Sequence, residues 1–294
     1  MTDIQRIAII GFGEAGSILG AELAARGRDV VIYDILLDSP GTRTALQAKA
    51  RAAQVQTADT QAAAIEGASL AISAVTASSA TAVASQAARS IRTGQIFLDI
   101  NSVSPSTKRE EAALIEAAGA DYVEAAVMAP LPPQRLKVPM LLGGRRAREL
   151  APALQALGMN TTAIADQVGV ASAVKMCRSV MIKGIEALTV ECLLAARRFG
   201  AEQEVLASLD ATYPSMGWLE TLPDYLVSRV AEHGRRRAAE MREVARTLED
   251  VKLEPSMSLA TAARQDWLID AMTVRGIEYP RHEPFSWRAL ADAL

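Results

Sequence analysis

Short apolar runs alternate with segments of helical periodicity over the first 165 residues of this chain. Continuous apolar runs of this length predict buried strands, here at residues 6–10, 29–34, 55–56, 69–75, 95–99, 122–128, 138–142 and 161–165. The intervening segments predict helices, at residues 17–26, 42–53, 60–67, 76–92, 105–119 and 145–157. Strands that alternate with helices predict an α/β fold with a doubly wound, mostly parallel sheet.

The pattern changes near residue 168, beyond which no strand-like run recurs. Residues 170–199 contain no proline and a single glycine, which predicts one helix of roughly 45 Å. Further helices are predicted at residues 202–210, 218–232, 235–251 and 256–274. We expect the end of the chain, residues 276–294, to be a tail with a short helix that packs on a neighbour. The sequence thus predicts an α/β domain over residues 1–166 and an all-α domain over residues 167–294.

A glycine-rich turn joins the first predicted strand to the first predicted helix. Gly11 allows a tight turn, Gly13 lets a pyrophosphate approach the backbone, and Gly16 lets the helix pack close to the sheet. The free N–H groups of the helix N-terminus attract phosphate. This is the fingerprint of a Rossmann dinucleotide-binding domain rather than a simple glycine turn. The expected cofactor contacts in the turn are Gly11, Phe12, Gly13, Glu14, Ala15 and Gly16.

An acid, Asp34, ends the second predicted strand, where it can accept hydrogen bonds from the ribose hydroxyls of a dinucleotide. A carboxylate at this place would repel a 2′-phosphate, which favours NAD over NADP. Arg43 is the nearest arginine that follows and leaves NADP possible.

Ligands of doubly wound sheets bind beyond the carboxyl ends of the strands. We therefore expect Val75, Thr76 and Asn101 to contact the cofactor. Asn101 and Ser102 also fit a capping turn before the helix that Pro105 opens, and capping is compatible with ligand contact.

Lys175 lies near the start of the long helix, between Val174 and Met176. Its side chain fits two interpretations. It extends along apolar surface to water, or it is buried beside a nicotinamide, where its pKa would fall and it could transfer a proton. Arg178 and Ser179 follow one turn later on the same side, and Lys183 two turns later.

Composition narrows the class of protein. The chain has 294 residues, of which 50% are hydrophobic and 22% charged, and this is a soluble globular composition. A net charge of -3 argues against nucleic-acid binding. Cys177 and Cys192 fit core thiols and no metal-binding spacing. With no secretory leader and no apolar run of membrane-spanning length, we expect a cytoplasmic protein without membrane contact.

These motifs together resemble the β-hydroxyacid dehydrogenases, relatives of 3-hydroxyisobutyrate and 6-phosphogluconate dehydrogenases. Beside the glycine turn, residues 99–105 resemble the family's first substrate loop, with Ser102 in register. Glu124 to Val127 resemble the approach to its second loop, and Gly143 and Gly144 its closing glycines. The segment 169–175 is similar to the one that carries the catalytic lysine, so the resemblance implies that Lys175 is the proton donor and acceptor. It also implies a homodimer through the all-α domain.

Three departures from the family pattern concern substrate contacts. Ser179 stands where the family has asparagine, and Met128-Ala129-Pro130 replace Ser-Gly-Gly in the second loop. A further family lysine aligns near Ala239. The chain therefore has fewer groups for a small hydroxy acid, and Arg178 or Asn101 can take over orientation of the substrate.

The C-terminal half resembles a branch with a phosphogluconate-dehydrogenase-like domain of unknown function, whose signature is similar to residues 233–241. That segment fits a solvated basic helix start equally well. In the functional interpretation His233, Arg236 or Arg237 supplies the lost anion contacts, since arginine binds carboxylates bidentately.

The resemblance implies an NAD(P)-dependent oxidoreductase that moves a hydride between the nicotinamide and the alcohol carbon of an organic hydroxy acid or a related alcohol, with a lysine as general acid and base. We expect the substrate to be a small anionic molecule. Two alternatives are an imine reductase of the same architecture and an NAD(H)-binding regulator without catalysis. The expected catalytic residues are Lys175, Ser179 and Arg178. The expected substrate contacts are Ser102, Met128, Ala129, Lys183, His233 and Arg237.

Overall fold

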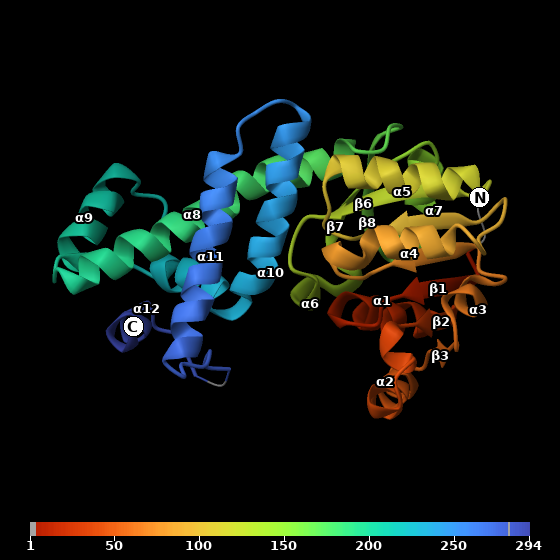
Figure 1. Ribbon diagram of the computed structural model, residues 1–294, viewed down its shortest axis with the longest axis horizontal. Coiled ribbons are helices and arrows are strands. Elements are labelled where there is room, and N and C mark those ends of the chain that lie inside the picture. Colours follow the sequence, from red (N-terminus) through yellow and green to blue (C-terminus); the bar gives the residue numbers. More distant parts are fainter. Residues whose placement is uncertain (1–3, 282) are drawn as a thin grey trace. The chain divides into compact units, whose positions relative to one another are not determined.

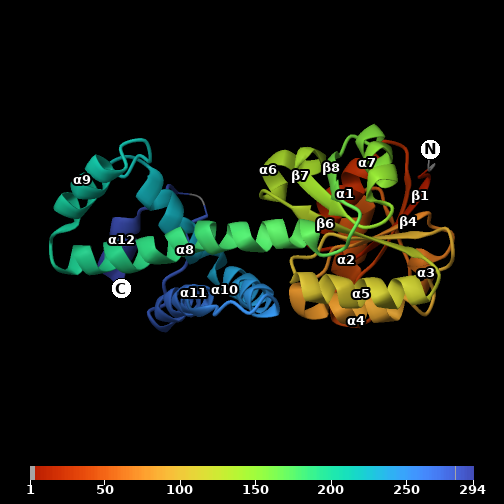
Figure 2. The same ribbon diagram turned by 90° about the horizontal axis from the view of Figure 1, so that it is seen from above.

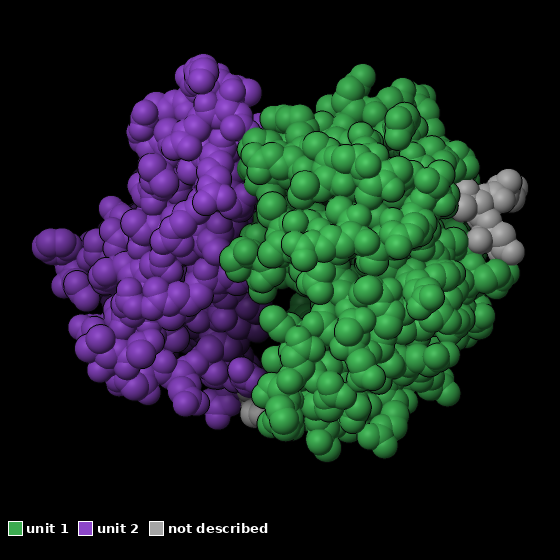
Figure 3. Space-filling model, turned by 45° about the vertical axis from the view of Figure 1, so that its right-hand side comes forward, with its two compact units in different colours: residues 1–175 green, residues 176–294 purple. Residues whose placement is uncertain are grey.

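The computed structural model describes residues 4–281 and 283–294. The chain forms two compact units, residues 1–175 and 176–294, shown in green and purple in Figure 3. We describe each unit by itself. The units divide after Lys175, beyond the boundary expected near residue 166, because the start of the long helix is bound to the sheet of unit 1.

Unit 1 is built on an eight-stranded sheet with the order β3-β2-β1-β4-β5-β6-β7-β8 (Figure 1). Neighbouring strands run parallel except β6 and β7. The predicted α/β class and doubly wound sheet are thereby confirmed. The strands are β1 (Arg6–Ile10), β2 (Asp29–Tyr33), β3 (Gln56–Thr57), β4 (Leu70–Ser73), β5 (Ile96–Asp99), β6 (Asp121–Val127), β7 (Pro139–Gly143) and β8 (Asn160–Ala165).

The reversal at β7 follows from its connection. Residues 128–138 connect it to β6, and their regular elements are only the four-residue helix α6 (Leu131–Gln134) and the short 3₁₀ turn η3 (Arg135–Lys137). A parallel crossover needs a dozen or more residues, usually with a full helix. β8 then runs parallel to β7, since the longer helix α7 (Ala147–Ala156) joins them.

Helices cover both faces of the sheet (Figure 2). Alternate residues of β1 show why both faces are apolar: Ile7 and Ile9 pack in one core, and Ala8 and Ile10 in the other. The first core is covered by α1 (Glu14–Ala24), α2 (Pro40–Ala52) and α7. The second is covered by α3 (Gln61–Ile65), α4 (Ala80–Ala87) and α5 (Pro105–Ala117).

Two short 3₁₀ turns differ from the expected elements. η1 (Ile35–Leu37) follows β2 directly, and its N-cap Asp34 accepts a hydrogen bond from Leu36. η2 (Ala77–Ser79) precedes α4, so the helix predicted over residues 76–92 is shorter than expected.

Helix α8 (Val170–Arg198) begins in unit 1 and continues into unit 2. The other helices of unit 2 are α9 (Glu202–Thr212), α10 (Leu222–Asp250), α11 (Ser256–Val274) and α12 (Trp287–Ala293). This confirms the expected all-α second half.

The prediction of two helices separated at residues 233–234 is wrong, because α10 runs unbroken through Gly234. A Cβ at Gly234 would lie 2.6 Å from Ile269 and 2.8 Å from the carbonyl oxygen of Gln265. The glycine therefore lets α10 and α11 approach closely, and it does not end a helix.

Two further expectations need correction. The C-terminal tail packs within its own unit: Trp287 is 1% exposed in the unit 2 core, and its backbone N–H donates to Asp224 at 2.8 Å. Cys177 and Cys192 are exposed and free, rather than core thiols. Both lie on α8.

Candidate functional site

The glycine turn has the geometry that a bound pyrophosphate requires. Gly11 has a φ of +92°, and a Cβ on it would collide with the carbonyl oxygen of Ala74. A Cβ on Gly16 would collide with the carbonyl oxygen of Gly11, so α1 packs directly on the turn. At Gly13, by contrast, a Cβ would meet no atom of the described residues within 4 Å. The space in front of the turn is open where a phosphate would lie.

Two charged side chains hold the turn from outside. Asp34 Oδ2 accepts a hydrogen bond from the backbone N–H of Phe12 at 2.6 Å. Lys49 on α2 donates to the carbonyl oxygens of Phe12 and Gly13 at 2.8 and 3.0 Å. Sequence reasoning identified Asp34 and missed Lys49, because its place in α2 gives no local signal. Glu14 and Ala15 form the first residues of α1, where Glu14 is exposed.

Asn101 ties together the ends of β4 and β5. Its Oδ1 accepts a hydrogen bond from the backbone N–H of Val75 at 2.7 Å, and its Nδ2 donates to Ser73 at 2.8 Å. The N-cap of α5 is Ser104, which accepts from the N–H of Thr107. Asn101 is therefore not the N-cap of α5. The expected cofactor contacts Val75 and Asn101 are linked directly by the hydrogen bond between them. Thr76 follows them and is exposed.

Ser102, in the same loop, has a buried hydroxyl oxygen that finds no hydrogen-bond partner among the described residues. Buried polar groups in proteins are nearly always paired. An orphaned hydroxyl at the carboxyl end of β5 fits a place where a ligand supplies the partner.

The second loop is occupied by its own backbone. The N–H of Met128 donates to the carbonyl oxygen of Pro139 at 2.9 Å, and Pro130 caps the short helix α6. Met128 and Ala129 are half-buried. Since the N–H of Met128 is already used and Pro130 has none, these two backbone positions have no N–H to give to a carboxylate.

The start of α8 is bound to β6 through Glu124, which is fully buried. Its carboxylate accepts hydrogen bonds from the backbone N–H groups of Gly169, Ala171 and Ser172 at 2.7, 2.9 and 3.3 Å. A carboxylate at a helix N-terminus is also attracted by the positive end of the helix dipole. Lys175 lies on this anchored first part of α8, in the same compact unit as the glycine turn.

Arg178 and Ser179 lie one turn beyond Lys175, in unit 2. Arg178 is exposed, and Ser179 is buried with 7% of its surface accessible.

The expected substrate contacts Lys183 and Arg237 are buried in ion pairs within unit 2. Lys183 contacts Glu240 at 2.6 Å, and Arg237 contacts both carboxylate oxygens of Glu186, with Nε to Oε2 at 2.8 Å. Burial lowers the pKa of Lys183, against the opposing effect of Glu240. Burial also raises the pKa of Glu186, although Arg237 opposes the change.

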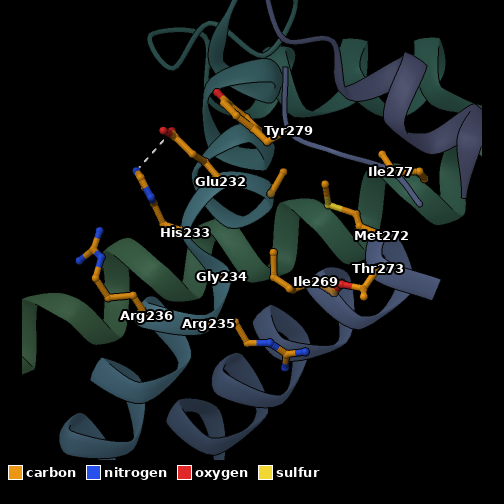
Figure 4. Close-up of a pocket in the computed structure, with 11 residues that line it drawn as sticks. Glu232, His233, Gly234, Arg235, Arg236, Ile269, Met272, Thr273, Ile277 and Tyr279 are labelled. Atoms are coloured by element: carbon orange, nitrogen blue, oxygen red, sulfur yellow. Dashed lines mark hydrogen bonds and ion pairs between the residues drawn. The ribbon is translucent and has the colours of Figure 1, made fainter. Parts of the chain in front are cut away.

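His233 faces a different region, a cavity of about 380 Å³ along α10 and α11 (Figure 4). Its ring pairs with Glu232 at 3.3 Å, and burial lowers its pKa against the effect of that carboxylate. Arg236 also lines this cavity and pairs with Glu240 at 2.6 Å, whereas Arg237 is not among the lining residues. The basic segment lies in the middle of α10 rather than at a helix start. Arg236 is exposed at the cavity, whereas Arg237 is buried in its ion pair with Glu186.

Two features of residues 4–281 and 283–294 concern other classes of site. No helix there is long and apolar enough to span a membrane. Nor do these residues contain a group of three or more histidine, cysteine, aspartate or glutamate side chains that could hold a metal ion.

A doubly wound sheet with an open glycine turn after its first strand, and a carboxylate after its second, defines a dinucleotide-binding protein. Residues 6–165 match the family model of the NAD binding domain of 6-phosphogluconate dehydrogenase, and the chain belongs to this family. Residues 196–268 match a domain of unknown function, DUF1932. The resemblance drawn from the sequence is thereby confirmed.

Three relatives show how far the likeness extends. A conserved hypothetical protein from Sinorhizobium meliloti 1021 is 38% identical, with a TM-score of 0.79, over 100% of this chain and 98% of that one. MTH1747, a conserved protein of unknown function described as similar to 3-hydroxyacid dehydrogenases, is 34% identical with a TM-score of 0.71, over 91% and 98%.

An uncharacterised 28.5 kDa protein of Methanothermus fervidus is 30% identical over 169 residues. That match covers 56% of this chain and 63% of the other protein, so the chain spans less than two thirds of this curated relative.

Proposed function

We propose that this protein is an NAD(P)-dependent oxidoreductase that moves a hydride between the nicotinamide and the alcohol carbon of an organic hydroxy acid. The observation that carries the proposal is the anchoring of α8 by Glu124. In the sheet, Glu124 on β6 pairs with Asp99 on β5. Asp99 precedes Asn101 by two residues. The helix that bears Lys175 is thus fixed to the strand next to the loop that bears Asn101 and Ser102.

The bound dinucleotide would supply the hydride acceptor, and Lys175 would move the proton. In the oxidation of an alcohol, Lys175 as a neutral amine would accept the hydroxyl proton while the bound nicotinamide would take up the hydride from the alcohol carbon. Reduction reverses both transfers. Lys175 is half-buried at the start of α8, and an amine is a suitable group for moving a proton to or from a hydroxyl. We assign Ser179 and Arg178, one turn on, to orienting the substrate.

We propose NAD as the preferred cofactor, with NADP possible. Asp34 keeps a carboxylate at the end of β2, where it would repel a 2′-phosphate. Arg43 is already engaged: its Nε donates to the carbonyl oxygen of Leu37 at 2.6 Å, and its guanidinium pairs with Asp59 at 3.0 Å. Both observations favour a cofactor with free ribose hydroxyls.

For the substrate we propose a small anionic molecule whose polar group reaches Ser102. The used N–H of Met128 and the missing N–H of Pro130 argue against the backbone carboxylate site of the second loop. We further propose that Lys183 and Arg237 shape unit 2 through their acidic partners, since both are buried in ion pairs. Arg178, which is exposed, remains for the substrate's acid group.

We also propose a homodimer through the helical unit. Large apolar side chains are exposed on α8 and just after it, among them Leu188 at 58% and Phe199 at 87%. Exposed apolar surface of this kind is typical of association sites. Sedimentation at micromolar concentration tests this, and a monomer would contradict it.

The experiment is turnover at 340 nm with NAD, then NADP, against a panel of hydroxy acids, alcohols and cyclic imines. We expect alcohol oxidation with NAD that is lost in Lys175→Ala and retained in the matched control Lys137→Ala, an exposed lysine. Turnover that survives Lys175→Ala contradicts the catalytic role. Reduction of imines without alcohol oxidation favours the imine reductase, and tight NADH binding without any turnover favours the regulator.

A further inference from the structure

A group of four ionisable side chains lies buried beneath the loop that bears Asn101 and Ser102. Lys108 and Glu111 come from α5, Asp99 from the end of β5, and Tyr122 from β6. None is more than 1% exposed. Full burial of a lysine is costly unless it is paired and hydrogen-bonded, so this arrangement calls for a reason beyond packing.

The hydrogen bonds of this group converge on Asp99. Lys108 Nζ donates to the carbonyl oxygen of Asp99 at 3.0 Å and to its Oδ2 at 2.7 Å. The Tyr122 hydroxyl lies 2.8 Å from the same Oδ2 and 3.0 Å from Glu111 Oε2. Burial alone would raise the pKa of Asp99, but the charge of Lys108 and the hydrogen bonds of Glu111 and Lys108 lower it. Asp99 is therefore ionised and balances Lys108.

The other oxygen of Asp99 binds the loop that follows β5. Oδ1 accepts a hydrogen bond from the backbone N–H of Asn101 at 2.8 Å. Asn101 in turn holds the N–H of Val75 and the hydroxyl of Ser73. A continuous chain of hydrogen bonds thus runs from Lys108 through Asp99 and Asn101 to the end of β4.

The strand order indicates which half of a dinucleotide would lie next to this chain of hydrogen bonds. In doubly wound sheets, the strands on one side of the switch point hold the adenosine half and those on the other side hold the second half. Here β1, β2 and β3 lie on one side, and β4, β5 and β6 on the other. The ends of β4 and β5, which Asn101 joins, belong to the second half.

We propose that Lys108 is a positioning residue for the nicotinamide half of the cofactor, acting through Asp99 and Asn101 on the loops after β4 and β5. This rests on the proposed function only as far as NAD(H) binding. Lys108 touches no ligand. It fixes the carboxylate that fixes Asn101, and it leaves the glycine turn and Asp34, which hold the other half, unaffected.

The test compares two ligands that differ by the nicotinamide: NADH and ADP-ribose, each titrated by calorimetry at pH 7.5. We expect Lys108→Met to weaken NADH about tenfold, the equivalent of one or two lost hydrogen bonds, and ADP-ribose less than about twofold. The paired change Asp99→Asn/Lys108→Met, which removes the buried charge and keeps an acceptor for the Asn101 N–H, should restore NADH to within about threefold.

Two more variants guard against a purely structural effect. Ile115→Ala, on the same helix and fully buried, should lower stability without changing the ratio of the two affinities. If Lys108→Met does not fold, Tyr122→Phe removes one donor to Asp99, and we expect the same selective loss at about threefold.

Equal weakening of NADH and ADP-ribose, or no weakening of either, overturns the proposal. A wild-type protein that binds neither ligand overturns the proposed function instead, so the two failures are distinguishable.

Discussion

The Glu124 carboxylate on β6 occupies the space in which a side chain of residue 143 on β7 would lie, because a Cβ on Gly143 would be 2.5 Å from Glu124 Oε1. That oxygen accepts the hydrogen bonds of Gly169 and Ala171 at the start of α8. The absence of a side chain at residue 143 therefore lets a buried carboxylate reach the helix that bears Lys175.

Gly143→Ala should displace Glu124 and loosen the start of α8. We expect a loss of about 1–3 kcal/mol in the free energy of unfolding, the usual cost of overpacking, together with a fall in turnover. Urea denaturation and the 340 nm assay measure the two effects. Gly184→Ala is the matched control: it lies on α8 with nothing near its Cβ position in the described structure, and it should be neutral or stabilising. Equal stability of the two variants would count against the overlap between a side chain at residue 143 and the Glu124 carboxylate.

Gly13→Ala should separate binding from folding. Its Cβ would enter open space, so the only cost to folding is the backbone of residue 13, whose φ of −68° and ψ of −145° lie outside the regions that L-residues favour; the free energy of unfolding should fall by about 1 kcal/mol. NADH binding should fall about tenfold or more, since a methyl group then occupies the place of the pyrophosphate.

Gly16→Ala is the contrast to that variant. Its Cβ would meet the carbonyl oxygen of Gly11, and the fold should lose about 1–3 kcal/mol. NADH titration and urea denaturation of both variants check this, and unchanged NADH affinity in Gly13→Ala would refute the phosphate assignment.

Much of the fold was predictable because local signals and tertiary structure agree. The predicted strand segments correspond to β1 to β8, and the glycine turn lies where its spacing places it. The long proline-free segment is α8. These features depend on periodicity and backbone geometry, which a single sequence carries.

The sequence-based predictions fail where a residue distant in the sequence determines the local structure. Gly234 weakens a helix by about 1 kcal/mol on propensity, so the sequence suggested a break there. The close approach of α11, some thirty residues later, explains the glycine instead. Asn101 fitted a cap and a ligand contact equally, and only the position of Val75 decides its hydrogen bond. The pairs Arg237–Glu186 and Lys183–Glu240 are likewise visible only once α8 and α10 pack together.

Removing one member of the buried pair Arg237–Glu186 should lower the free energy of unfolding much more than replacing both members with apolar residues. Arg237→Met or Glu186→Met alone leaves an unpaired buried charge, with an expected loss of about 3–5 kcal/mol. The double replacement should recover most of that loss. All three tryptophans lie in unit 2, so tryptophan fluorescence during urea denaturation follows this unit.

The more exposed pair of Arg264 and Glu191 provides the control for that series. Arg264→Met should change the free energy of unfolding by less than about 1 kcal/mol. If the double replacement is as unstable as the two single changes combined, the two side chains are not coupled.

Glu111 should make the stability of unit 1 depend on pH. Burial, and then the neighbouring Asp99, raise its pKa from the ordinary 4.5 to about 9, so it is protonated in the folded protein at neutral pH. The unfolded chain releases this proton near pH 4.5. The stabilisation by the neutral carboxyl is therefore complete below pH 4.5 and is lost as pH rises to about 9. Within this window one proton corresponds to a slope of about −1.4 kcal/mol per pH unit at most.

Glu111→Gln removes the titration and keeps a neutral side chain of similar shape. Urea denaturation followed by circular dichroism between pH 5 and pH 9 should show the wild type losing stability relative to this variant as pH rises. The comparison between the two proteins cancels the titration of all other groups. Because a glutamine donates and accepts differently from a carboxyl, a constant offset between the curves is expected and does not bear on the result. Two parallel curves would mean that Glu111 does not hold a proton in the folded protein over this pH range, which would contradict the prediction.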